Sequence, residues 1–391
     1  MSVARKIKAS MESASWIRRM FEEGAELKAR LGPEQVLDFT LGNPDLEPPP
    51  RFKEELLKAV QDPAPGLHGY MPNAGLLSAR QALAENLSLQ YGQPFGAQDL
   101  VLTCGAAGGL NVALKALLDP GDEVIFFAPF FPEYFFYVDN HGGAARVVET
   151  DERFQLDLDR LEQALSPRTR AVLINSPNNP TGQVYPAEAL AALGRLLLQH
   201  SERHGGIVYL LADEPYGRLV YDGLALPNIF SAYPHTILVT SSSKELSIPG
   251  ERLGLAAVSP QAADREEVVA GLILANRILG FVNAPALMQR VLAKLGGIAV
   301  DIAPYARRRD LFSRILTQAG YDFVKPQGAF YFFPKAPGGD DLAFVARLKQ
   351  ENILAVPGRG FGRAGYFRLA FCVPESTIEN AAPGFARAAK G

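Results

Sequence analysis

Short apolar runs that alternate with amphipathic helical patterns constrain the fold of this 391-residue chain more than any other feature. Helical patterns such as Gly109–Leu118 and Pro186–His200 separate several of the runs. Strand–helix alternation predicts an α/β fold, in which a mostly parallel seven-stranded sheet is flanked by helices. Ligands bind such sheets beyond the carboxyl ends of the strands. The expected buried strands are Val101–Thr103, Glu123–Phe127, Arg146–Glu149, Ala171–Asn175, Ile207–Ala212, Ile237–Thr240 and Leu253–Val258.

The two ends of the chain have a different pattern, which predicts a second domain. A helix at Ala14–Arg30 and a strand at Val36–Leu41 precede a proline-rich break at Glu47–Pro50. We therefore expect a large domain at 50–290 and a small α+β domain formed from 1–49 and 291–391. The expected C-terminal elements are helices Pro304–Ala319 and Pro374–Ala389, and strands Tyr321–Lys325, Ala329–Phe333, Ile353–Val356 and Gly365–Cys372.

Charge, hydropathy and cysteine content exclude several classes of protein. Lys and Arg number 39 against 42 Asp and Glu, and the net charge of −3 does not suggest binding to nucleic acid or a membrane surface. The longest apolar stretch, Val268–Ala275, is far shorter than the ~20 residues of a membrane span. The two cysteines, Cys104 and Cys372, form neither a disulfide framework nor a zinc cluster. We expect a cytoplasmic protein without nucleic-acid, membrane or metal partners.

Two loops that follow expected strands are candidates for ligand binding. The small residues of Cys104–Leu110 let backbone N–H groups approach an anion at a helix start, although an empty strand–helix turn has the same composition. The two prolines of Asn175–Gly182 rigidify a loop with the amide of Asn179 at its centre. A purely structural turn, in which Asn179 bonds its own backbone, is the alternative.

Two further segments place charged groups after apolar runs. Asp213, followed by Tyr216, ends one run, and a buried acid is unfavourable unless it meets a cation or hydrogen-bond donors. A helix cap and a core tyrosine are the alternatives. The segment Ser241–Gly254 brings serines, Lys244 and Arg252 to the end of another run. These groups suit a phosphate and an electrophile, whereas an isolated lysine is usually a solvated surface residue.

The order and spacing of these segments resemble the fold type I pyridoxal 5′-phosphate (PLP) aminotransferases of class I/II, and most closely their aspartate-aminotransferase-like bacterial branch. The resemblance runs from Leu41–Asp45 to Phe367–Leu369 and includes Tyr70–Gly75. It implies a PLP-dependent enzyme that moves the amino group of an L-amino acid to a 2-oxo acid, with 2-oxoglutarate expected, by a ping-pong mechanism through a Lys244 Schiff base.

The resemblance also implies a role for each residue around the cofactor ring. Lys244 forms the Schiff base and moves the substrate Cα proton, for which we expect its pKa to be lowered. Asp213 faces the pyridine nitrogen and keeps the ring protonated. Asn179 and Tyr216 hydrogen-bond the phenolic oxygen, and Phe131 stacks on the ring.

The remaining roles concern the phosphate and the substrate. Tyr70 resembles the tyrosine that reaches the phosphate of the neighbouring subunit, which implies a homodimer. Arg368, with Gly42 and Asn179, takes the substrate α-carboxylate; a surface ion pair is the alternative for Arg368. The phosphate ligands implied within one chain are Gly105, Ala106, Ala107, Ser241, Ser243 and Arg252.

One departure from the family pattern concerns the substrate. The aspartate-using branch commonly has a lysine where this chain has Ala107. Loss of a charged hydrogen bond of ~1.5–3 kcal/mol makes aspartate a doubtful donor. The aromatic run Phe126–Tyr137 favours a hydrophobic donor, or else fills the core. A C–S or β-eliminating lyase on the same fold is the alternative function. A DNA-binding regulator on this fold is disfavoured by the short segment before Gly42 and the acidic charge.

Overall fold

The computed structural model describes residues 3–13 and 24–390, and the chain divides into two compact units. The larger unit comprises Leu46–Asn178 and Gln183–Asp301. The smaller unit comprises Met1–Asp45, Asn179–Gly182 and Ile302–Gly391. The smaller unit therefore contains residues from both ends of the chain and a short insertion from its middle.

The units change at residues 45/46 and 301/302, whereas the sequence placed the domain boundaries at 49/50 and 290/291. The segment after α12 (Ala286–Leu292) stays with the larger unit because the backbone N–H of Val300 donates to the carbonyl of Glu245 at 2.8 Å. Helix α12 itself packs against α3 (Pro50–Gln61).

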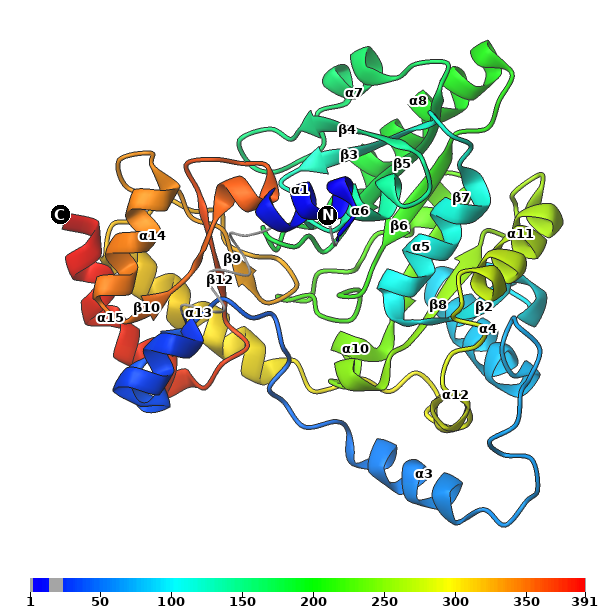
Figure 1. Ribbon diagram of the computed structural model, residues 1–391, viewed down its shortest axis with the longest axis horizontal. Helices are drawn as coiled ribbons and strands as arrows, with labels where there is room; N and C mark the ends of the chain where they lie inside the picture. Colours follow the sequence, from blue (N-terminus) through cyan, green and yellow to red (C-terminus); the bar gives the residue numbers. More distant parts are fainter. Residues whose placement is uncertain (1–2, 14–23, 391) are drawn as a thin grey trace. The chain divides into compact units, whose positions relative to one another are not determined.

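A seven-stranded sheet forms the centre of the larger unit (Figure 1). Its strand order is β2-β8-β7-β6-β5-β3-β4, and β8 runs antiparallel to both neighbours while the other pairs are parallel. The prediction of a mostly parallel seven-stranded sheet is confirmed. The strands are β2 (Leu100–Cys104), β3 (Glu123–Ala128), β4 (Ala144–Glu149), β5 (Thr169–Asn175), β6 (Tyr209–Asp213), β7 (Thr236–Ser241) and β8 (Leu253–Val258).

Strand β4 differs from the prediction, because the run Arg146–Glu149 was expected to be a buried strand. It lies at the edge of the sheet and pairs with β3 alone, so that Val148 is its single buried residue. Arg146 forms a 2.8 Å ion pair with Glu123 instead of packing into the core. Charged side chains on an edge strand also discourage pairing with other chains.

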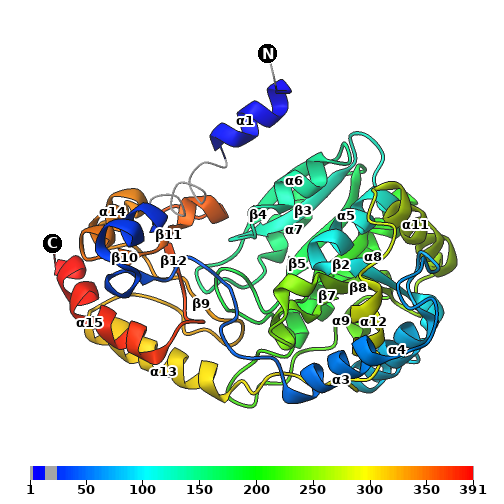
Figure 2. The ribbon, with the colours of Figure 1, turned by 60° about the horizontal axis from the view of Figure 1, so that its bottom comes forward.

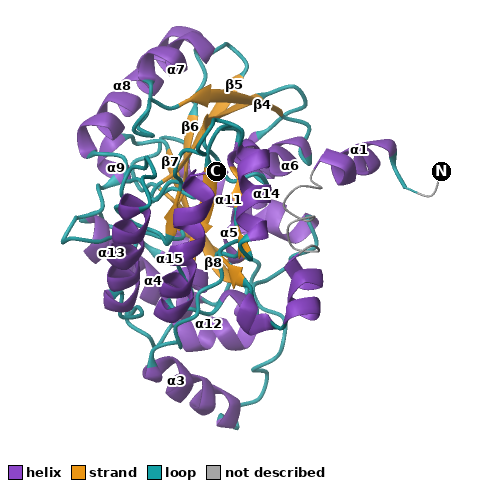
Figure 3. Cartoon of the chain, turned by 90° about the vertical axis from the view of Figure 1, so that its left-hand side faces the viewer, coloured by secondary structure: helices purple, strands orange, loops and turns teal. Residues whose placement is uncertain are grey.

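Helices cover both faces of the sheet (Figure 3). Strand side chains alternate between two apolar cores, so that Leu210 packs in one and Leu211 in the other. Helices α5, α6 and α11 contribute to the core around Leu211, and helices α3, α4, α7, α8, α9 and α12 to the core around Leu210. The helices are α4 (Leu77–Tyr91), α5 (Gly105–Leu117), α6 (Tyr134–Asp139), α7 (Leu158–Ala164), α8 (Ala187–His204), α9 (Ile229–Ala232) and α11 (Arg265–Ile278), with a 3₁₀ turn η2 (Ala97–Asp99).

An aromatic core holds the smaller unit together. The ring of Phe312 lies 5.1 Å from Phe39, 5.4 Å from Phe332 and 5.5 Å from Phe385, measured between centroids. Phe312 and Phe385 belong to two helices that lie side by side (Figure 2). The helices of this unit are α1 (Arg5–Ser13), residues 24–31, α13 (Ala303–Gln318), α14 (Asp341–Gln350) and α15 (Glu375–Lys390), with 3₁₀ turns η1 (Pro33–Gln35) and η4 (Gly358–Phe361).

The strands of the smaller unit are short. β1 (Leu37–Asp38) pairs in parallel with β10 (Ile353–Leu354). β12 (Phe367–Ala370) pairs antiparallel with β11 (Val356–Pro357) and β9 (Tyr331–Phe332).

One predicted element near the C-terminal end of the chain is absent, and one near the N-terminal end is described only in part. The strand expected at Tyr321–Lys325 is wrong, because this segment joins no sheet. Tyr321 is fixed by its ring, 5.9 Å from that of Phe385, and by its hydroxyl, which donates to the Phe385 carbonyl at 3.0 Å. Of the helix expected at Ala14–Arg30, residues 14–23 lie outside the described residues. Within the described ranges, the structure contains no helix that is both long and apolar enough to span a membrane.

Candidate active site

The register of the large sheet gathers the chemically interesting segments at one edge. Strands β5, β6 and β7 are parallel, and the sheet pairs Asn175 with Asp213 and Ser241 with Gly254. Strand β2 also ends there, because Cys104 pairs with Leu253 at the start of the antiparallel strand β8. The loops after β2, β5, β6 and β7, and the segment before β8, therefore leave the sheet on the same side.

Asp213 is a buried carboxyl group with one oxygen unsatisfied. Its Oδ2 accepts a 2.5 Å hydrogen bond from the hydroxyl of Tyr134, while its Oδ1 is buried and has no partner among the described residues. The side-chain amide of Asn175 donates to the Asp213 backbone carbonyl at 2.8 Å. Burial raises the pKa of Asp213 to about 7, and the Tyr134 hydrogen bond acts in the opposite direction. Such a group favours a cationic or N–H partner at Oδ1.

The start of helix α5 forms an anion cradle. The Cys104 side chain does not cap the helix, and the first N–H groups of a helix have no intrahelical acceptor. Gly105 has φ +70°, and a Cβ there would lie 2.7 Å from Nη2 of Arg252. A Cβ on Gly254 would lie 2.5 Å from the carbonyl carbon of Gly105. Close packing at the helix start therefore depends on both glycines and sets a guanidinium beside the N–H groups.

This geometry corrects one sequence interpretation. The small residues from Gly105 onward were expected to be a turn before a helix that begins at Gly109. They form the first turn of α5 itself, which includes Ala106 and Ala107. Their backbone N–H groups therefore carry the positive end of the helix dipole.

Lys244 lies on a short helix, α10 (Ser242–Glu245), directly after β7. Lys244 is half-buried, and both Ser241, which precedes the helix, and Ser243 are buried. The 3₁₀ turn η3 (Pro249–Glu251) follows and leads to Arg252, whose Nη1 donates to the Pro249 carbonyl at 2.9 Å.

Arg368 is the centre of a second cluster, in the smaller unit. Its Nη1 donates to Oδ1 of Asn179 at 3.0 Å, and its Nη2 donates to the Thr40 carbonyl at 2.6 Å. The guanidinium carbon lies 4.8 Å from the ring centroids of both Tyr331 and Phe361, and Nε is buried with no partner in the part of the chain that the structure describes. The alternative of a surface ion pair is thereby excluded for Arg368, which is 8% exposed.

Gly42 lies in the same cluster as Arg368. A Cβ on Gly42 would lie 2.7 Å from Cζ of Tyr331. The backbone therefore approaches that ring more closely than it could if position 42 carried a side chain. Thr40, Tyr331 and Phe361 were not predicted from the sequence. Their link to Arg368 arises from contacts between segments far apart in the chain.

The comparisons with known proteins identify the family. The model of the family "Aminotransferase class I and II" matches residues 34–385. The chain belongs to this family. It is 33% identical to the aspartate/prephenate aminotransferase of Thermus thermophilus over 98% of both chains. A solved amino transferase structure from Eubacterium rectale is 39% identical, with TM-score 0.96 over 100% of this chain and 99% of the other. The aspartate aminotransferase of T. thermophilus with maleate is 30% identical, with TM-score 0.85 over 99% and 100%.

The family is PLP-dependent, and this chain is a PLP-dependent aminotransferase whose substrates are amino acids and 2-oxo acids. The relatives do not favour the alternative of an eliminating lyase.

The structure also places the remaining predicted residues of the aminotransferase. Tyr216 is buried just beyond β6, and the half-buried ring of Phe131 lies 5.6 Å from that of Tyr134, in an edge contact. Phe126 and Phe130 pack against each other at 5.0 Å, so these two rings of the aromatic run fill the core. Tyr70, in contrast, is 97% exposed.

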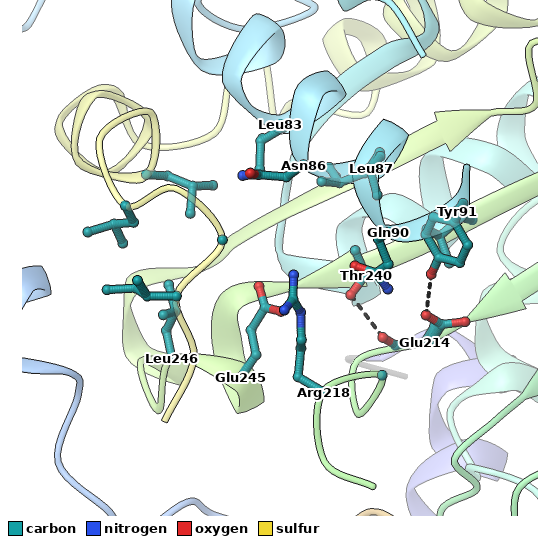
Figure 4. Close-up of a pocket in the computed structure, with 17 residues that line it drawn as sticks. Leu83, Asn86, Leu87, Gln90, Tyr91, Glu214, Arg218, Thr240, Glu245 and Leu246 are labelled. Atoms are coloured by element: carbon teal, nitrogen blue, oxygen red, sulfur yellow. Dashed lines mark hydrogen bonds between the residues drawn. The ribbon is translucent and has the colours of Figure 1, made fainter. Parts of the chain in front are cut away.

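A cavity of about 60 Å³, lined by both polar and apolar side chains, lies in the larger unit of the aminotransferase (Figure 4). Glu214 and Glu245 line it, and each directly follows a predicted site residue. The hydroxyl of Tyr91 donates to Glu214, and Arg218 lies beside Glu245. Burial raises the pKa of Glu214 to about 8 and that of Glu245 to about 7. This cavity could not be predicted from the sequence, because acids that directly follow a motif residue form no pattern of their own.

Proposed function

We propose that this aminotransferase moves the amino group of an L-amino acid to 2-oxoglutarate in two alternating half-reactions at a site built around Lys244. The observation that carries the proposal is the carboxyl group of Asp213, which is buried with Oδ1 unsatisfied. The ring nitrogen of PLP fits this oxygen. A protonated ring nitrogen would supply the missing cation and lower the pKa of Asp213 from about 7, so that the carboxyl group ionises.

The phosphate of PLP fits the start of α5. The uncapped N–H groups of Gly105, Ala106 and Ala107 and the guanidinium of Arg252 offer donors to a dianion. The hydroxyls of Ser241 and Ser243 follow β7 at the same edge of the sheet and add further donors. These groups supply positive potential without a second charged side chain.

Each residue around the PLP ring has a separate role in the proposed reaction. Bound PLP supplies an electron sink for the charge that develops at the substrate Cα. The Nζ of Lys244 would hold the aldehyde of PLP covalently and would carry the proton that leaves the substrate Cα. Asn179 and Tyr216 would donate to the phenolic oxygen of PLP, and Phe131 would stack on its ring.

Arg368 binds the substrate α-carboxylate. Its guanidinium carbon lies 4.8 Å from the centroids of both the Tyr331 and the Phe361 rings, and its buried Nε has no partner among the residues that the structure describes. Such an arrangement favours a planar anion that can accept two hydrogen bonds. The backbone of Gly42 packs directly against the Tyr331 ring that contacts the arginine, so a side chain at position 42 would displace this ring.

The amino donor depends on position 107. The T. thermophilus relative is named for both aspartate and prephenate. Ala107 lies in the first turn of α5 and offers no charge to a distal carboxylate. We therefore propose that apolar donors are used at least as well as aspartate.

Tyr70 supports a homodimer. Its side chain is 97% exposed, so it packs on none of the described residues of its own subunit. We propose that its hydroxyl completes the phosphate site of a second copy. A cytoplasmic location stays a prediction from the sequence.

A spectral titration tests the proposed function. Amino acids are added singly to the purified holoenzyme, and the absorption band of the bound cofactor is followed. We expect the band to change to that of the amine form with some donors, and to return on addition of 2-oxoglutarate. The matched control is Lys244→Ala, which we expect to bind the cofactor without this change. A band that stays while pyruvate and ammonia accumulate would instead establish a lyase.

A further inference from the structure

Tyr134 is held in place by a backbone hydrogen bond and by contacts of its ring with the core. It is the first residue of α6, and its backbone N–H donates to the Phe131 carbonyl at 3.1 Å. Its ring makes edge contacts with Phe126 at 5.7 Å and with Phe131 at 5.6 Å, and it is 1% exposed. The position of its hydroxyl is therefore determined by the core of the larger unit.

That hydroxyl is the single hydrogen-bond donor to the Asp213 carboxyl group within the described residues. Asn175 holds the backbone of Asp213, and Tyr134 holds Oδ2. These two contacts fix the backbone and the carboxyl group of Asp213. They leave Oδ1 as the oxygen that can take a ligand. A freely rotating carboxyl group would present either oxygen in many orientations.

We infer that Tyr134 is a positioning residue of this aminotransferase, which holds one oxygen of Asp213 so that the other takes the ring nitrogen of PLP. The inference rests on the role proposed for Asp213. A phenol that donates to a carboxylate also stabilises the charged form, so that the proton resides on the ring rather than on the acid. The Tyr134 hydrogen bond indeed lowers the pKa of Asp213 against the effect of burial.

The turn 131–134 would then contribute to two contacts with the cofactor. Phe131, at its start, is the ring proposed to cover the cofactor face, and Tyr134, at its end, orients the group that meets the ring nitrogen. The backbone bond between these two residues links both contacts. Through this bond, a tyrosine that lies in an apolar core is held next to the proposed cofactor site.

The test isolates the ring nitrogen. The cofactor-free enzyme is titrated with PLP and with 1-deazapyridoxal 5′-phosphate, in which C–H replaces the ring nitrogen, and the ratio of the two dissociation constants is measured. We expect Tyr134→Phe to reduce the preference for PLP roughly tenfold or more, as for loss of a hydrogen bond to a charged group. The matched control is Tyr185→Phe, at a tyrosine that is also 1% exposed but makes no hydrogen bond to Asp213. It should leave the ratio unchanged.

Two further variants separate this inference from the proposed function. Asp213→Asn should abolish the preference, and Tyr134→Phe added to Asp213→Asn should have no further effect on the ratio. If Asp213→Asn lowers the ratio but Tyr134→Phe behaves like the control, Tyr134 has no positioning role. If Asp213→Asn leaves the ratio unchanged, the role of Asp213 itself is wrong and the inference falls with it. Partial unfolding of a variant affects both ligands equally and cancels from the ratio.

Discussion

Asp213→Asn should make the cofactor-free enzyme more stable at alkaline pH than the unchanged protein. Asp213 is 6% exposed, and burial raises its pKa from 3.8 to about 7. Between these values the folded chain retains a proton that the unfolded chain has released, so stability falls as pH rises through this window. The full difference corresponds to about 4 kcal/mol, since each pH unit contributes about 1.4 kcal/mol. Asparagine does not titrate, so the variant does not lose this part of its free energy of unfolding.

Urea unfolding of the cofactor-free proteins at pH 4.5 and pH 8.5 measures the effect. We expect the stability of Asp213→Asn relative to the unchanged protein to rise by about 3 kcal/mol between the two values. Glu214 and Glu245 titrate in both proteins, so the contribution of Glu245 cancels and that of Glu214 largely does, because the charge of Asp213 is the smallest of the causes that act on the pKa of Glu214. The exposed Asp159 gives the control variant Asp159→Asn, which should show no comparable trend. A difference between the two proteins that is the same at both pH values would refute the reasoning.

Three further substitutions test the phosphate, carboxylate and donor positions. Arg368→Lys should raise the KM of amino acid substrates roughly ten- to a hundredfold, because lysine cannot form a bidentate pair with the substrate carboxylate; unchanged KM values would contradict this. Gly105→Ala should weaken PLP binding at least about tenfold, as its Cβ would lie 2.7 Å from Arg252 at φ +70°. Reconstitution of the apoenzyme measures it, and unaltered affinity would exclude the cradle. Ala107→Lys should raise kcat/KM for aspartate about ten- to a hundredfold with little change for phenylalanine. Equal effects on both donors would place residue 107 away from the distal carboxylate.

The large sheet could be predicted because each of its strands is a short apolar run bounded by turns or helical patterns. The smaller unit was harder, because β1, β9 and β10 span two residues each and show no periodicity. Tyr321–Lys325 has the composition of a strand, but its aromatic side chain packs against α15 instead of a sheet partner. Residues Asn179–Gly182 group with the smaller unit through tertiary contacts that no local pattern encodes.

The site residues that follow strands could also be predicted, because the ends of parallel strands share one edge. Lys244, Asp213 and Gly105 belong to this group. Tyr134 could not be assigned a role, since it is 79 residues from Asp213 in the chain and lies in an aromatic run typical of a core. Thr40 lies 328 residues from Arg368, so their hydrogen bond is likewise invisible in the sequence.

The central claim is that Lys244 anchors the cofactor of this aminotransferase. Borohydride reduction of the holoenzyme, followed by proteolysis and mass spectrometry of the peptides, tests this claim most directly. We expect the cofactor mass on the peptide that contains Lys244, and no adduct in Lys244→Ala. An adduct on another lysine, or none in a protein that has retained its cofactor, would contradict the assignment.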